Sequence, residues 1–129
     1  MFTRSFDIDD TITAAPEHFA KLSKETYAQG GRVVIITSRL DEPDIRASTV
    51  DELAGYGIRY DELYMFKSFD EMPACPHVEL DWQLQYLWQK VVYAREASVS
   101  EHYDDDDRVL KLLRRHALNI EVVDAKNIV

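Results

Sequence analysis

The sequence has few cysteines, few basic residues for its acidic content, and no long apolar run. Cys75 is the only cysteine among 129 residues. This excludes an internal disulfide and is typical of proteins in the reducing cytoplasm. No stretch approaches the roughly 18 consecutive apolar residues of a membrane-spanning helix, and no signal peptide is recognisable. We therefore expect a cytoplasmic protein with no membrane partner.

Basic residues are outnumbered by acidic ones: 15 Lys and Arg accompany 24 Asp and Glu, which gives a formal net charge of −9. This balance disfavours an extended nucleic-acid footprint and binding to anionic membranes, although it leaves room for a local basic patch. Hydrophobic residues make up 46% and charged residues 30%, as in ordinary globular proteins. Because there is no internal repeat, low-complexity tract or linker, we expect a single domain over residues 1–129.

Short apolar runs that end in polar residues alternate with helical patterns along the chain. Runs rich in valine and isoleucine predict buried parallel strands, here at residues 2–8, 32–39, 61–66, 97–107 and 119–123. Helical patterns lie between them, at residues 16–30, 45–53, 84–91 and 107–117. This alternation predicts an α/β, three-layer Rossmann-like domain, in which a five-stranded parallel sheet is covered by helices on both faces.

Polar side chains gather where the predicted strands end. In such sheets ligands bind beyond the carboxyl ends of the strands. At these ends the sequence places Asp7, Asp9 and Thr11, then Thr37, Ser38 and Arg39, then Lys67, and finally the four aspartates 104–107. Carboxylate oxygens are the ligands that Mg²⁺ prefers, and protein-bound Mg²⁺ is usually shared with a substrate phosphate. The first and fourth strands must be neighbours for their aspartates to share one ion, which gives the strand order 3-2-1-4-5.

Four segments also form an ordered set of motifs. "FDIDDTIT" is an apolar strand followed by Asp-x-Asp-x-Thr, and "VVIITSR" is an apolar strand that ends in Thr and Ser. "YMFK" carries a lysine, and "HYDDDD" ends in an acidic run. In this order the four segments resemble the motifs of the haloacid-dehalogenase-like (HAD) phosphatases. The likeness covers most of the chain, and the four motifs together are more specific than the first alone.

The resemblance implies a magnesium-dependent phosphomonoester hydrolase that forms an aspartyl phosphate. Asp7 would attack phosphorus, and Asp9 would protonate the leaving oxygen and then activate water. The Asp7 carboxylate and the Asp9 main-chain carbonyl would hold Mg²⁺, together with Asp104 or Asp105 from the fourth strand. Thr37 would hydrogen-bond a phosphate oxygen, and further contacts to the substrate are expected from Thr11, Ser38 and Arg39.

A lysine would neutralise the charge on Asp7 and the phosphoryl group, and Lys67 is the residue expected in this role. In some members of the family, however, the lysine opens the helix before the fourth strand. The matching region here is "ELDWQLQYLWQK", where Gln83 occupies a plausible lysine position and Lys90 lies further on. The sequence therefore leaves open whether Lys67 is the lysine of the third motif or whether that lysine is lost at Gln83.

The segments between Asp9 and Thr37 and between Lys67 and His102 are too short to hold a folded cap domain. The resemblance then implies an open site. Capless members of the family typically act on large phosphorylated substrates, such as protein or nucleic-acid ends, or use a neighbouring subunit of a homo-oligomer as a lid over a small one.

Two other functions compete with this interpretation. A binding or regulatory module on the same scaffold, without turnover, would fit a missing third-motif lysine. A phospho-accepting receiver domain is also a small parallel α/β domain with an acidic pocket. It would need its phosphoacceptor after the third strand, where this sequence has a lysine.

Overall fold

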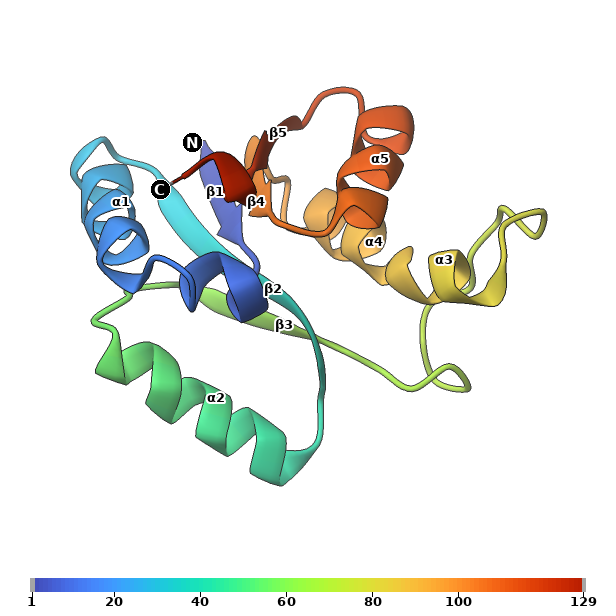
Figure 1. Ribbon diagram of the computed structural model, residues 1–129, viewed down its shortest axis with the longest axis horizontal. Coiled ribbons are helices and arrows are strands. Elements are labelled where there is room, and N and C mark those ends of the chain that lie inside the picture. Colours follow the sequence, from blue (N-terminus) through green and yellow to red (C-terminus); the bar gives the residue numbers. More distant parts are fainter. Residues whose placement is uncertain (1, 129) are drawn as a thin grey trace.

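Five strands form one parallel sheet in the computed structural model, which describes residues 2–128 (Figure 1). The strands are β1 (Thr3–Phe6), β2 (Arg32–Leu40), β3 (Glu62–Phe66), β4 (Glu101–Asp104) and β5 (Glu121–Asp124). Their order in the sheet is β3-β2-β1-β4-β5, and every neighbouring pair is parallel. The predicted α/β class and the predicted strand order are both confirmed. As the prediction required, β1 lies next to β4.

The helices occupy the segments between the strands. They are α1 (Pro16–Ala28), α2 (Pro43–Gly55), α3 (Trp82–Leu87), α4 (Gln89–Glu96) and α5 (Asp107–His116), with short helical turns at Ile8–Ile12 and Ala125–Asn127. The single helical pattern around residues 84–91 corresponds to two consecutive helices, α3 and α4, which meet at Trp88. Two glycines with positive φ, Gly30 (+80°) and Gly57 (+73°), follow α1 and α2, where a left-handed residue is favourable.

The alternating residues of β2 explain why helices cover both faces of the sheet. Val33 and Ile35 face a core that includes Phe19 of α1 and Leu53 of α2. Val34 and Ile36 face the opposite core, with residues of α3, α4 and α5. All four β2 side chains are fully buried, as expected for a central strand of a parallel sheet. The result is a three-layer arrangement, with α1 and α2 on one side and α3, α4 and α5 on the other.

The connections between strands are short. The segment between β1 and β2 contains one helical turn and α1, and the segment between β3 and β4 contains a loop, α3 and α4. Neither segment of the described chain folds into a separate cap. Among residues 2–128, no helix has both the length and the apolar character needed to cross a bilayer.

Candidate functional site

The site lies at the carboxyl edge of the sheet, where β1 and β4 end side by side. The Asp7 amide donates to the carbonyl of Tyr103 at 3.0 Å, which continues the pairing of the two strands by one residue. Asp104 is the last residue of β4. Both carboxylates are almost fully buried, with 5% of Asp7 and none of Asp104 exposed. Such burial of two like charges requires a cation close by.

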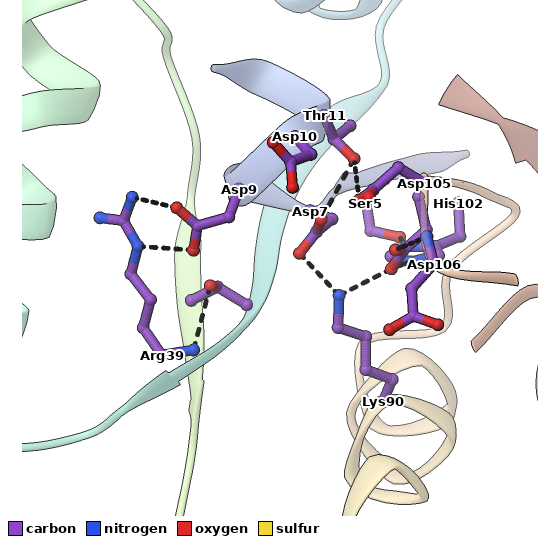
Figure 2. Close-up of polar contacts among 12 residues, drawn as sticks. Ser5, Asp7, Asp9, Asp10, Thr11, Arg39, Lys90, His102, Asp105 and Asp106 are labelled. Carbon is purple, nitrogen blue, oxygen red and sulfur yellow. Dashed lines mark hydrogen bonds and ion pairs between the residues drawn. The ribbon is translucent and has the colours of Figure 1, made fainter. Parts of the chain in front are cut away.

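Lys90 of α4 supplies that cation. Its ammonium donates to Asp7 Oδ1 at 2.7 Å and to Asp104 Oδ2 at 2.6 Å, and the side chain is only 3% exposed. Figure 2 shows Lys90 reaching up from its helix between the two strand ends. Burial works against the charged form of Lys90, but Asp104 and Asp7 keep its pKa above the ordinary range. The lysine is therefore a fixed positive charge against Asp7.

A third carboxylate completes an acidic cluster. One oxygen each from Asp7, Asp104 and Asp105 lie within 4.8 Å of one another. The Thr11 hydroxyl lies 3.1 Å from Asp7 Oδ2 and 3.1 Å from Asp105 Oδ1, so it bridges two of them. Three carboxylates against one lysine leave a surplus of negative charge and several oxygens that a hard cation would accept. The donor set therefore fits Mg²⁺.

The two most deeply buried carboxylates of the cluster, Asp7 and Asp104, have pKa values that are shifted in opposite directions. Burial, with a further contribution from Asp104, raises the pKa of Asp7 from 3.8 to about 7 even though Lys90 opposes the shift. Asp104 behaves in the opposite way. Burial opposes its ionisation, but Lys90 and His102 hold the pKa of Asp104 well below its usual range. The cluster therefore carries one firmly ionised carboxylate and one, Asp7, that needs more positive charge to ionise fully at neutral pH.

His102 is a member of the site that the motifs did not identify. It is fully buried on β4, with Nε2 2.9 Å from Asp104 Oδ2 and Nδ1 2.6 Å from Ser5 Oγ. Burial keeps the pKa of His102 below its ordinary value. The neutral ring can donate from Nε2 to Asp104 while Nδ1 accepts from Ser5. His102 thus fixes the orientation of Asp104. The available signal was its position two residues before Asp104, on the same face of the strand.

The end of β2 departs from regular pairing and presents Ser38 and Arg39 to the site. Thr37 pairs with Met65 and Leu40 pairs with Phe66, so two extra residues of β2 lie between consecutive partners on β3. Irregularities of this kind re-aim side chains next to active sites. Ser38 lines the pocket. Thr37 is fully buried, and its hydroxyl accepts the amide of Arg39 at 3.2 Å.

Arg39 binds Asp9 through two parallel hydrogen bonds. Its Nε and Nη2 donate to the two oxygens of Asp9 at 3.0 and 2.8 Å. These hydrogen bonds lower the pKa of Asp9 below 3.8. Asp9 also lines the pocket, with its side chain 58% exposed. Figure 2 shows Asp9 turned toward Arg39 while Asp7 points toward Lys90, so the two aspartates have different surroundings.

Lys67 is not at the site. It is exposed just after β3, where its amide and carbonyl are bonded to the side chain of Gln89 at 2.9 and 3.0 Å, and it lines two depressions separate from the acidic pocket. The expectation that Lys67 neutralises Asp7 therefore needs correction, because Lys90 occupies that position. Gln83 is exposed on α3, and Lys90 comes about two helical turns later.

The pocket is small, open and strongly polar. Six aspartates line it, together with Ser38, Lys90 and two apolar side chains. The aspartates are Asp7, Asp9, Asp10, Asp104, Asp105 and Asp106, and the apolar residues are Leu87 and Val109. Asp106 has a second contact, because its side chain accepts the amide of Arg108 at 2.9 Å and caps α5. The structure therefore brings together Asp7, Asp9, Thr11, Ser38, Asp104 and Asp105 from the residues that the sequence singled out.

Comparisons with known proteins support the fold. No protein-family model and no curated protein matches the chain. Among solved structures, a chain of the "Structure of Pnkp1/Rnl/Hen1 complex" matches with a TM-score of 0.65 and 22% identity over 95% of this chain. A chain of the "Structure of the Pnkp1/Rnl/Hen1 RNA repair complex" matches with a TM-score of 0.65 and 20% identity, also over 95%. The chain spans only 45% and 41% of these two neighbours. At this identity the likeness establishes the Rossmann-like fold alone.

Proposed function

We propose that the chain is a magnesium-dependent phosphomonoester hydrolase of the HAD type, which works through an aspartyl phosphate. The observation that carries the proposal is the buried Asp7 carboxylate, which receives a hydrogen bond from Lys90 at 2.7 Å and lies within 4.8 Å of the oxygens of Asp104 and Asp105. A carboxylate surrounded in this way is suited to meet a second anion, because a fixed cation offsets the repulsion between them.

In this proposal Asp7 is the nucleophile. One of its oxygens attacks phosphorus, the bond from phosphorus to the leaving oxygen breaks, and Asp9 gives that oxygen a proton. Asp9 then removes a proton from a water molecule, which attacks the phosphorus of the aspartyl phosphate and releases inorganic phosphate. Lys90 replaces Lys67 as the lysine that neutralises Asp7 and the phosphoryl group. Thr37 and Ser38, at the end of β2, are assigned to the phosphate oxygens.

The metal ligands in this proposal are the carboxylates of Asp7, Asp104 and Asp105 and the main-chain carbonyl of Asp9. When bound there, Mg²⁺ would supply positive charge to both the carboxylate and the phosphate. His102 and Thr11 keep two of these carboxylates oriented through the hydrogen bonds described above.

The substrate class follows from the open pocket. With no cap over the site, a phosphate at the end of a large molecule can reach Asp7. One of the similar structures is described as an RNA repair complex, so we propose nucleic-acid ends as the first substrates to test. Residues 1–129 would then act as one catalytic domain, with a second copy of the chain as the lid if the substrate is small.

A binding module without turnover is the weaker alternative. Its main motivation was the missing lysine at position 83. Lys90 supplies a buried ammonium directly on Asp7, so this motivation no longer applies.

The test is hydrolysis of p-nitrophenyl phosphate by the purified protein with Mg²⁺ and with EDTA. Phosphorylated oligonucleotides, nucleoside monophosphates and phosphopeptides would then be compared. We expect Mg²⁺-dependent release of phosphate that is lost in Asp7→Asn, which keeps the shape of the side chain but removes the nucleophile. Equal rates for the wild type and Asp7→Asn would refute the proposal.

A further inference from the structure

Arg39 is held from two sides. While Nε and Nη2 bind Asp9, Nη1 donates to Glu52 Oε1 at 2.9 Å and to Thr49 Oγ1 at 3.1 Å, both on α2. Glu52 is itself fixed, because Tyr56 donates its hydroxyl to Glu52 Oε2 at 2.8 Å. The guanidinium therefore has partners on all three of its nitrogens, and a continuous chain of hydrogen bonds runs from Tyr56 to Asp9.

Asp9 needs such support more than Asp7 does. Its side chain is 58% exposed, whereas the side chain of Asp7 is 7% exposed and bonded to Lys90. A half-exposed carboxylate rotates freely unless something holds it. The two parallel bonds to Arg39 fix both oxygens, which is the arrangement in which an arginine orients a carboxylate best.

We propose that Glu52 is a positioning residue for the second step of the reaction. Resting on the proposed function, the inference is that Glu52 anchors Arg39 so that Arg39 holds the Asp9 carboxylate at the rim of the pocket, facing the water that attacks the aspartyl phosphate.

The consequence is that Glu52 affects one step and not the other. Formation of the aspartyl phosphate from p-nitrophenyl phosphate needs no proton for its leaving group, so it should not depend on the orientation of Asp9. Hydrolysis of the aspartyl phosphate does need Asp9. A residue with a merely structural role would change both steps together.

The experiment separates the two steps. Wild type, Glu52→Ala and Asp51→Asn are each mixed in excess with ³²P-labelled p-nitrophenyl phosphate and Mg²⁺, and both nitrophenol release and protein-bound phosphate are followed over time. Asp51 is the matched control, because it is the exposed neighbour of Glu52 on α2. We expect Glu52→Ala to slow the decay of protein-bound phosphate by about tenfold while nitrophenol release changes by less than about twofold, since orienting a base contributes only part of its total effect.

Asp51→Asn should behave as the wild type in both steps. If Glu52→Ala slows both steps equally, or slows neither, the inference is wrong even though the enzyme is active. If the wild type releases no nitrophenol and binds no phosphate, the proposed function fails and the inference fails with it. Should Glu52→Ala not fold, Glu52→Leu carries the test, because it keeps the bulk of the side chain on α2 but accepts no hydrogen bond from Arg39. Slowing of the second step alone would support the inference, and no slowing would overturn it.

Discussion

At the scale of single residues, the site depends on how one lysine is shared. Lys90 contacts two buried carboxylates, Asp7 and Asp104, and cannot satisfy both as fully as it would satisfy one. Burial raises the pKa of Asp7, whereas Lys90 and His102 together keep the pKa of Asp104 low. The charge of Asp7 therefore depends on anything cationic that enters the pocket.

Asp7 should therefore destabilise the metal-free protein as the pH rises. The pKa of Asp7 is about 7 in the folded state, against 3.8 for an aspartate without contacts. Between about pH 4 and 7 the folded protein therefore holds a proton on Asp7 that the unfolded chain has released. The free energy of unfolding then falls with rising pH in this window. In EDTA, the free energy of unfolding of Asp7→Asn should rise relative to that of the wild type by at least about 1 kcal/mol between pH 5 and pH 8, since one pKa unit is worth about 1.4 kcal/mol.

Urea unfolding at the two pH values measures this difference. Asp9→Asn is the control, because the pKa of Asp9 is lowered. Its ion pair is fully formed above the ordinary pKa of an aspartate and is lost only in stronger acid, so this variant should keep a constant offset from the wild type between pH 5 and pH 8. An Asp7→Asn difference that does not change with pH would mean that Asp7 is already ionised in the folded protein at pH 5.

Replacing Lys90 should have a severe effect. In Lys90→Met the two carboxylates lose their buried partner, and breaking such a pair costs about 3–5 kcal/mol. If Lys90 stabilises charge in the transition state, as the proposed function requires, its loss should lower kcat by at least about 10²-fold. Thermal unfolding with and without Mg²⁺, and hydrolysis of p-nitrophenyl phosphate, measure the two effects. Lys67→Ala, at an exposed lysine, should have a free energy of unfolding within about 0.5 kcal/mol of the wild type and keep its activity. If Lys67→Ala lost activity while Lys90→Met kept it, Lys67 would be the lysine of the site.

At the scale of elements, strands were easier to predict than the exact positions of helical residues. The run of Val and Ile in β2 was the clearest strand signal, because such side chains are buried on both faces of a parallel sheet. The other four strands are short, and β1, β3 and β4 contain no Val or Ile. The alternation of strands with helical patterns placed them. The aspartates of the site followed, since Asp7 and Asp104 are fixed to strand ends. Lys90 could not be placed in this way. It projects from a helix whose length and angle to the sheet depend on packing, so the choice among positions 67, 83 and 90 required the structure.

The irregular pairing at the end of β2 could not be predicted from the sequence either. Nothing in "VVIITSR" indicates that Ser38 and Arg39 are extra residues between the partners Thr37 and Leu40. The pairing of Arg39 with Asp9 depends on the local path of two chain segments that are 30 residues apart in sequence. Contacts of this kind arise from tertiary structure and have no local pattern.

Asp105 and Asp106, at the start of α5, have different contacts. Asp106 accepts the amide of Arg108 as the N-cap of the helix, whereas Asp105 belongs to the acidic cluster. Asp106→Ala should lower the free energy of unfolding by about 1 kcal/mol, and Asp106→Asn should be nearly neutral because asparagine caps helices as well as aspartate does. Urea unfolding measures both, and calorimetric titration should find the same Mg²⁺ affinity in the two variants. A large loss of affinity in Asp106→Asn would place Asp106 among the ligands.

At the scale of the whole molecule, Mg²⁺ should stabilise the fold. The ion would bind carboxylates that repel one another only when β1 and β4 bring them together, so it binds the folded state selectively. At a hundredfold excess over the dissociation constant the gain is about 2.7 kcal/mol. A thermal shift titration measures this gain, and Asp105→Asn should need more Mg²⁺ for the same shift. A melting temperature that millimolar Mg²⁺ leaves unchanged in the wild type would argue against a metal site.

The contact between Lys90 and Asp7 joins residues that are 83 positions apart in the chain. The carboxylate and the ammonium therefore meet only after α1, β2, α2 and β3 have been accommodated between them. Closing so long a loop is slow compared with forming a local helix. A chain arrested before Lys90 is synthesised would contain Asp7, Asp9 and Thr37 but no positive charge against Asp7. The proposed phosphatase activity should thus recover during refolding only when the second half of the chain has folded, later than signals from helices alone.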